Sequence, residues 1–214
     1  MKLYGFGPTR SLRAEWALNE VGADYEFIQV RPLAGEQLTP EFLALNPAAK
    51  VPVLVDGDVI VPESAAIVFY LAEKFPQSGL MPADLAARAA AYRWVMFTMT
   101  ELEQPLWRIA RNTFLYAEES RQPTDVAIAR QEFTAMAAVL DKHMRDREFI
   151  VGDRFGVADC VTAYIVDWAD NQGLIGDFPE LRAYLARAYA RPTAPMRIAA
   201  AFAAVNTQSA ATAA

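Results

Sequence analysis

Short apolar runs alternate with amphipathic helical patterns over the first 75 residues. Val51–Val55 and Val59–Val61 are apolar runs around Asp56-Gly57-Asp58, a pattern typical of a hairpin. Apolar residues recur at helical spacing from Ser11 to Val21, and Gly22 follows as a stop. We expect strands at 2–6, 25–30, 51–55 and 59–61, and helices at 11–21, 40–45 and 64–75. Residues 1–78 are therefore predicted to form a small βαβαββα domain.

The rest of the chain carries no comparable strand signal. Helical patterns rich in Ala, Leu and Arg cover 84–115, 123–146, 157–170 and 178–190. We therefore expect a linker at 79–84 and an all-α domain at 85–205. Residues 206–214 have little apolar surface to bury and are expected to fray. The predicted fold class is an α/β domain followed by an all-α domain.

Composition excludes several classes of function. The 214 residues are 54% apolar and carry a net charge of −6. Nucleic acids and anionic membranes bind basic surfaces, so this negative charge argues against both as partners. No apolar run is long enough to span a membrane, and the first 20 residues do not resemble a signal peptide. One Cys and one His leave no internal disulfide, no Cys-x-x-Cys pair and no ordinary zinc site. We expect a cytoplasmic protein without a metal.

Two features of the first domain suggest a peptide-binding site. Pro52 opens an apolar run although it cannot donate to a sheet, which a cis bond after Val51 would explain. The alternative is a strand that merely begins with proline. Glu63-Ser64 at a helix start supplies a carboxylate and unpaired N–H groups, although a plain helix cap would use the same residues. Together these features are suited to hold an extended peptide by its backbone, ammonium and carboxylate.

Three segments in this order resemble the soluble glutathione transferases, in particular bacterial members with a serine- or threonine-type active-site loop. They are Asn46-Pro47…Lys50-Val51-Pro52-Val53-Leu54, Glu63-Ser64-x-Ala66-Ile67 and Gly152-Asp153-Arg154-Phe155-Gly156-Val157-Ala158-Asp159. The resemblance covers nearly the whole chain. It implies a thioredoxin-like domain that binds glutathione as cosubstrate, a helical second domain that receives a small electrophile, and a homodimer.

The resemblance also implies how glutathione is held. The backbone of Val51, before a cis Pro52, would pair with the cysteinyl part of the peptide. Glu63 would take the γ-glutamyl ammonium, while the Ser64 hydroxyl and the helix N–H groups would take its carboxylate.

Two more residues are candidates for the glycyl carboxylate. Lys50 directly precedes Val51, although a solvated surface lysine is an equal alternative. Gln37 lies in a segment similar to one where the family often has His or Gln.

The chemical step requires a hydrogen bond to the sulfur of glutathione, because a free thiol with a pKa of about 8.5 is mostly protonated at neutral pH. Thr9, four residues before Arg13, is the first candidate for this donor, although serine is more usual there. Ser11 is the second candidate, and it would otherwise cap the helix. Tyr4 is the tyrosine-type candidate.

A pocket for the electrophile is expected in the second domain. Trp107, Arg108, Arg111 and Tyr116 fall roughly on one side of a helix. An arginine that points into this pocket would favour an anionic electrophile. In the alternative interpretation the aromatic rings are core, and the arginines pair with Glu101, Glu103 or Glu118.

Other conspicuous residues are predicted to be structural. Gly156 should cap a helix whose third residue, Asp159, reaches back to the N–H of the cap. Cys160 should be a buried small hydrophobe, and His143 should lie on the surface of the 123–146 helix.

The sequence thus favours a glutathione S-transferase that conjugates the glutathione thiolate to a small electrophile. A non-catalytic glutathione-binding or assembly module of the same fold is the main alternative. A glutathione-dependent isomerase or peroxidase would share the thiolate site. A reductase that works through its own cysteine is disfavoured, because the first domain contains none.

Overall fold

The computed structural model describes the backbone of residues 1–212 and the side chains of residues 1–205 and 207. The chain divides into two compact units, of which one contains Met1–Pro82 and the chain from Tyr189 onward, and the other contains Ala83–Ala188. The break after Pro82 falls within the predicted linker. No described helix is long and apolar enough to cross a membrane.

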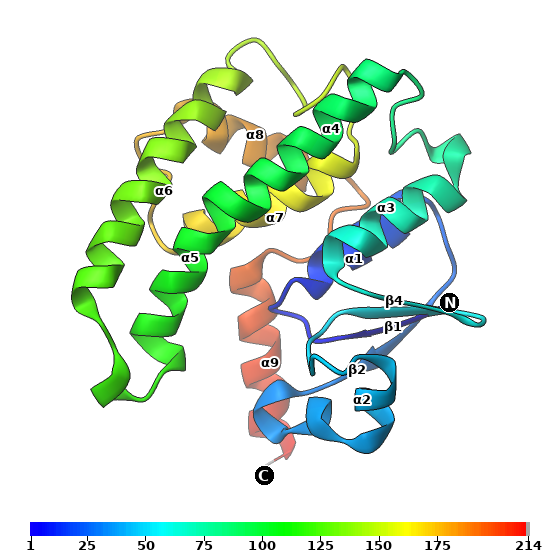
Figure 1. Cartoon of the computed structure of the whole chain (residues 1–214), viewed down its shortest axis with the longest axis vertical. Coiled ribbons are helices and arrows are strands. Elements are labelled where there is room, and N and C mark those ends of the chain that lie inside the picture. Colours follow the sequence, from blue (N-terminus) through cyan, green and yellow to red (C-terminus); the bar gives the residue numbers. More distant parts are fainter. Residues whose placement is uncertain (213–214) are drawn as a thin grey trace. The chain divides into compact units, whose positions relative to one another are not determined.

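A four-stranded mixed sheet organises the first unit (Figure 1). The strands β1 (Lys2–Gly5), β2 (Glu26–Gln29), β3 (Val53–Asp56) and β4 (Val59–Pro62) lie in the order β2-β1-β3-β4. The β1–β2 pair is parallel and the two other pairs are antiparallel, so β3 and β4 form the predicted hairpin. This topology confirms the predicted α/β fold of the first domain.

Helices cover both faces of this sheet (Figure 1). The helices α1 (Ser11–Glu20) and α3 (Ser64–Lys74) pack together on one face, and α2 (Pro40–Leu45) lies on the other. Trp16 and Ile67 are fully buried on the α1–α3 side, where burial of a large apolar side chain contributes about 2 kcal/mol. On the opposite face Val30, Phe42 and Val53 form a second cluster, against which Tyr4 and Val51 pack.

The end of the chain joins the first unit through a helix that the sequence did not indicate. Helix α9 (Ile198–Thr212) approaches the loop after β1, where a Cβ added to Gly7 would lie 3.9 Å from Ala201. The segment before α9 is tied to α1, because Arg191 donates two hydrogen bonds to Glu20 at 2.7 and 2.8 Å. Helix α9 includes residues 206–212 of the segment expected to fray, and residues 213–214 lie outside the described part of the chain.

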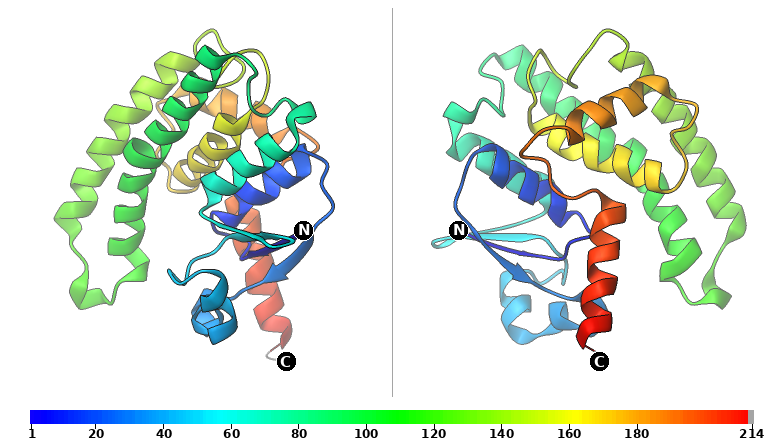
Figure 2. Two further views of the ribbon diagram at one scale, coloured as in Figure 1. Left: turned by 45° about the vertical axis from the view of Figure 1, so that its right-hand side comes forward. Right: turned by 180° about the vertical axis from the view of Figure 1, so that it is seen from behind.

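The second unit is helical, as predicted (Figure 2). It contains α4 (Leu85–Phe97), α5 (Glu103–Ala110), α6 (Pro123–Met144), α7 (Val157–Asn171) and α8 (Pro179–Tyr189). Two π-helical turns, Thr98–Leu102 and Arg111–Leu115, precede and follow α5. Nearly every residue of α7 is buried, so this helix is the centre of the unit, and Cys160 on it is fully buried as expected.

The start of α7 is held by the expected cap. The Asp159 carboxylate accepts hydrogen bonds from the N–H of Gly156 at 2.9 Å and from that of Ile150 at 3.0 Å. The Tyr184 hydroxyl of α8 donates to the same carboxylate at 3.0 Å. Asp159 therefore joins the loop before α7 to two helices.

His143 lies on α6 as predicted, but its ring is less exposed than a surface position implies. Its ring is half-buried against the Trp94 indole, with ring centroids 4.1 Å apart, and its Nε2 lies 2.8 Å from the Ile150 carbonyl oxygen. Burial lowers the pKa of His143 from its ordinary value of 6.5, and the positive charges of Arg147 and Arg93 lower this pKa further. The sequence pattern could not reveal this contact, because α4 is distant in the chain.

This environment predicts how stability depends on pH. The folded chain holds a proton on His143 less readily than the unfolded chain. The contribution of the neutral His143 ring to the free energy of unfolding is therefore complete above pH 6.5 and is lost on acidification. As the chain has one histidine, its ring-proton NMR signals can be followed against pH without ambiguity. The midpoint of the His143 titration should lie at a lower pH in the folded chain than in the urea-unfolded chain. A midpoint at or above the unfolded value would contradict the buried ring.

Candidate functional site

The turn before β3 has an unusual backbone that presents Val51. The Val51-Pro52 bond is cis, as expected, and Ala49 has a positive φ of 54°. The buried Asn46 side chain closes this turn, since it donates to the Lys50 carbonyl at 2.8 Å and accepts from the Ala48 N–H at 3.1 Å. This role of Asn46 was not predicted from the sequence. Asn side chains commonly form turns of this kind, so Asn46-Pro47 was the available signal.

Glu63 and Ser64 form the first turn of α3. Glu63, not Ser64, is the N-cap residue, and its side chain makes no cap hydrogen bond. Its φ of 71° is uncommon for a residue with a side chain, and such conformations concentrate at functional sites. No ion pair among the described residues involves the exposed Glu63 carboxylate. This carboxylate is therefore available for a cation, beside the unpaired N–H groups of a helix start.

A buried arginine supports Ser64 from behind. Arg13 of α1 is fully buried, and its Nη1 donates to the Ser64 Oγ at 3.2 Å. Because Ser64 accepts this bond, its own hydroxyl proton remains available to a ligand. The guanidinium also adds positive charge to the start of α3, where the helix dipole already favours an anion. The sequence did not reveal this role of Arg13, which lies on the buried side of α1 with Trp16 and Ala17.

Thr9 and Ser11 form a closed hydrogen-bonded pair in the loop between β1 and α1. The Thr9 hydroxyl donates to the Phe6 carbonyl at 2.6 Å and accepts from the Ser11 N–H at 3.2 Å. The Ser11 hydroxyl accepts from the Phe6 N–H at 3.1 Å and lies 2.9 Å from the Thr9 hydroxyl. This arrangement requires glycine at position 5, since an added Cβ would lie 2.9 Å from Ser11.

Exposure separates the three candidates for the sulfur contact. Ser11 is fully buried, whereas Thr9 and Tyr4 are half-buried. The Tyr4 ring packs edge-on against Phe42, with centroids 6.4 Å apart. Thr9 is thus the accessible hydroxyl of the loop.

The two candidates for the glycyl carboxylate differ in their surroundings. The side chain of Lys50 is exposed, and no ion pair within the described chain involves it. Gln37 is half-buried, and its Oε1 has no hydrogen-bond partner among the described residues. Both side chains have unused hydrogen-bonding capacity.

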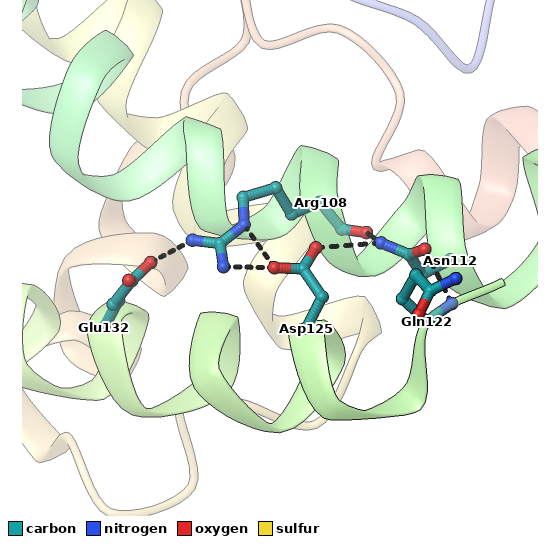
Figure 3. Close-up of polar contacts among 5 residues, drawn as sticks. All are labelled: Arg108, Asn112, Gln122, Asp125 and Glu132. Atoms are coloured by element: carbon teal, nitrogen blue, oxygen red, sulfur yellow. Dashed lines mark hydrogen bonds and ion pairs between the residues drawn. The ribbon is translucent and has the colours of Figure 1, made fainter.

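In the second unit, Arg108 pairs with acidic residues of α6 (Figure 3). Its Nε donates to the Asp125 carboxylate at 3.0 Å, and its Nη1 bonds to Glu132. The hydrogen bond from Arg108 is the main cause of the lowered pKa of Asp125. The partners expected from the sequence, Glu101, Glu103 and Glu118, are wrong for Arg108.

Asn112 completes this network (Figure 3). Its Nδ2 donates to the Asp125 carboxylate at 2.9 Å, and its Oδ1 accepts from the Gln122 N–H at 3.0 Å. Arg108 thus joins α5 to α6.

The other three pocket candidates surround the end of α5. Trp107 is half-buried and lies edge-on to Trp168, with centroids 6.3 Å apart. The Arg111 guanidinium lies 5.9 Å from the ring centroid of Tyr116, which is 41% exposed. Arg111 forms no ion pair within the described residues, and its Nε is buried without a hydrogen-bond partner. Arg111 is therefore better placed than Arg108 to meet an anion.

Two family models match the chain. The glutathione S-transferase N-terminal domain matches residues 1–73, and the glutathione S-transferase C-terminal domain matches residues 85–192. The chain belongs to the glutathione S-transferase family. Glutathione is the cosubstrate of this family, which agrees with the peptide-binding features of the first unit.

Sequence and structure relatives agree with this assignment. A zeta-class glutathione S-transferase from Euphorbia esula is 36% identical over 163 residues, which cover 74% of this chain and 71% of that protein. A glutathione transferase from Burkholderia graminis, solved with two glutathione molecules bound per subunit, has a TM-score of 0.82 and 32% identity, and covers 90% of this chain and 85% of its own. A family member from Pseudomonas fluorescens, solved with two glutathione bound, has a TM-score of 0.79 and 31% identity over 90% of this chain and 89% of its own.

Proposed function

We propose that this protein is a glutathione S-transferase that directs the glutathione thiolate at a small electrophile. The start of α3 is the observation that supports the binding of glutathione. Glu63 offers an unpaired carboxylate to the γ-glutamyl ammonium, and Ser64 offers its hydroxyl proton and helix N–H groups to the neighbouring carboxylate. The backbone of Val51 before the cis Pro52 pairs with the cysteinyl residue. Lys50 binds the glycyl carboxylate through its exposed ammonium, and Gln37 binds it through the N–H donors of its side-chain amide.

Thr9 supplies the contact to the sulfur in this proposal. It is an accessible hydroxyl at the start of α1, and a hydrogen bond there favours the thiolate over the thiol. Its hydroxyl donates to the Phe6 carbonyl, so it must turn toward the sulfur to contact glutathione. Tyr4 and Ser11 are the alternative donors.

The electrophile is received at the end of α5. Trp107 and Tyr116 supply aromatic surface, and Arg111 supplies a guanidinium that forms no ion pair within the described residues. These groups favour an aromatic electrophile that bears a negative charge. Arg108 serves only to hold α5 on α6.

The closed Thr9–Ser11 pair favours one competing function. A hydroxyl has one proton to donate, and the proton of Thr9 is used within the loop. A glutathione-binding module without catalysis needs no donor to the sulfur, so a Thr9 proton that stays within the loop would suit it.

The variant Thr9→Val tests the proposed chemistry. Removal of one hydrogen-bond donor to a developing charge should lower kcat/KM with a generic aryl halide by about 10–100-fold. The affinity for glutathione, measured by calorimetry, should change by less than about threefold. The conservative variant Thr9→Ser should keep most of the activity and serves as the control.

Two results would argue against this assignment. Full activity of Thr9→Val would remove Thr9 from the chemical step and direct attention to Tyr4→Phe. A wild-type protein that binds glutathione without turning over any electrophile in a broad panel would support the non-catalytic module.

A further inference from the structure

A group of basic side chains lines a cavity where α6 ends. The lining residues come from α4, from the last turns of α6 and from the turn that follows; they are Arg93, Trp94, Val139, Lys142, His143, Arg145, Asp146 and Arg147. The cavity has a volume of about 520 Å³. The cavity is open to solvent, and its four cationic side chains are exposed. We name this feature the basic cavity.

The charges of the basic cavity are not balanced within the protein. Four cationic side chains line it, against the single carboxylate of Asp146. Within the described part of the chain, no ion pair involves Arg93, Lys142, Arg145 or Arg147. The whole chain carries a net charge of −6, so this positive surface is a local reversal. Such a surface attracts anions.

One of these cations is held in place by the floor of the basic cavity. The Arg93 guanidinium lies 4.6 Å from the centroid of the Trp94 ring, which is only 3% exposed. The same indole contacts the His143 ring, which is fixed in turn by the Ile150 carbonyl. A guanidinium stacked on a buried indole loses less freedom when it binds an anion.

The turn that carries Arg147 is also fixed. The Arg147 N–H donates to the Met144 carbonyl at 3.1 Å, and its carbonyl accepts a bond from Arg187 of α8 at 3.1 Å. The cavity is therefore lined by a fixed turn after α6 and by the fixed Arg93 side chain of α4.

Stabilisation of a helix end explains only part of this arrangement. Basic residues near the last turn of α6 complement the helix dipole, which accounts for Lys142 and Arg145. Arg93 belongs to the interior of a different helix, α4, and its guanidinium faces the same cavity. Convergence of cations from two helices and a turn indicates a ligand with several negative charges.

We propose that the basic cavity binds a small oligophosphate, either inorganic or as part of a nucleotide. Guanidinium groups match phosphate oxygens in geometry, and a lysine adds a point charge. Several linked phosphates offer several negative charges, which matches the four cationic side chains that line the cavity. This site is independent of the proposed function, because none of its residues belongs to the proposed glutathione or electrophile sites.

The test uses the full chain without divalent metal, titrated with sodium tripolyphosphate and separately with ATP. The single His143 provides the readout, because a bound polyanion should raise its pKa and shift its ring-proton NMR signals in a saturable way. Equal affinities for the two probes would show that the phosphates alone are sufficient for binding. Tighter binding of ATP would identify a nucleotide as the preferred ligand. Either result supports the proposal.

Charge-removing variants locate the site. Arg93→Gln and Arg147→Gln should each weaken the binding of tripolyphosphate by about tenfold or more, as expected for loss of a charge-assisted contact. Arg130→Gln, an exposed position on α6 outside the cavity, removes the same charge and should weaken binding by less than about twofold. Arg147 lies in an exposed turn, so its variant should fold even if Arg93→Gln does not.

The proposal is overturned if neither probe gives a saturable shift at concentrations up to about 1 mM, the weak end of specific binding. Equal losses of affinity in Arg130→Gln and Arg147→Gln would also overturn it, because binding would then follow overall charge. Transfer activity with glutathione should be unchanged in Arg147→Gln.

Discussion

Asp159→Ala is expected to lower the free energy of unfolding by about 3–4 kcal/mol, because it leaves buried donors without an acceptor. The carboxylate is 1% exposed and accepts from Ile150, Gly156 and Tyr184, all within 3.0 Å. For a chain of this length the loss corresponds to a fall in Tm of about 10 °C. Thermal unfolding followed by circular dichroism measures it.

Asp153→Ala is the matched control for this variant. Asp153 lies in the same loop, is exposed, and has no hydrogen bond within the described residues. Its replacement should change stability by less than about 0.5 kcal/mol. If both variants unfolded at nearly the same temperature, the cap of α7 would not be a main support of the second unit.

Glu63→Gln is expected to weaken the binding of glutathione by about 10–100-fold, which is the loss of a charge-assisted contact to an ammonium. The fold should be unaffected, because the Glu63 side chain is exposed and makes no cap hydrogen bond. Isothermal titration calorimetry with glutathione measures the change directly.

A second ligand and a control variant make this prediction specific. An S-conjugate whose γ-glutamyl amine is acetylated lacks the positive charge, so it should bind wild type and Glu63→Gln with similar affinity. Asp58→Asn removes a carboxylate at the tip of the β3–β4 hairpin and should leave the affinity for glutathione within about twofold of wild type. An unchanged affinity of Glu63→Gln would exclude Glu63 as the ammonium partner.

Local patterns in the sequence predicted most of the fold. The hairpin around Asp56-Gly57-Asp58 and the start of α3 at Ser64 follow from turn residues and apolar periodicity, and both are present. The capping role of Asp159 could be predicted for the same reason, because both partners of the cap lie within a few residues. Helix α9 was missed, since its Ala-rich sequence has no strong apolar periodicity.

Contacts between distant segments could not be predicted in the same way. The alternative interpretation paired Arg108 with glutamates near it in the chain, whereas its partners lie on α6, 17 and 24 residues away. His143 was assigned to the surface because Trp94, its neighbour, belongs to another helix. The support that Arg13 gives to Ser64 joins residues 51 positions apart. A periodic pattern shows which face is buried, but it does not show what lies opposite.

The sequence indicated Thr9 and Ser11 at the loop before α1 without separating their roles. Both carry hydroxyls near the start of α1, and residue type alone made either a candidate. The structure gives Ser11 a buried position behind Thr9, and it shows the Thr9 proton donated to Phe6. The buried position of Ser11 depends on the close approach of Gly5, a tertiary contact.

A crystal structure of this protein with glutathione bound is the decisive experiment for the proposed site. We expect the γ-glutamyl ammonium at the Glu63 carboxylate, its carboxylate at the Ser64 hydroxyl and the α3 N–H groups, and the cysteinyl backbone paired with Val51. The sulfur should lie within hydrogen-bond reach of the Thr9 hydroxyl. Glutathione bound elsewhere, or bound here without contact to Glu63, Ser64 and Val51, would contradict the account.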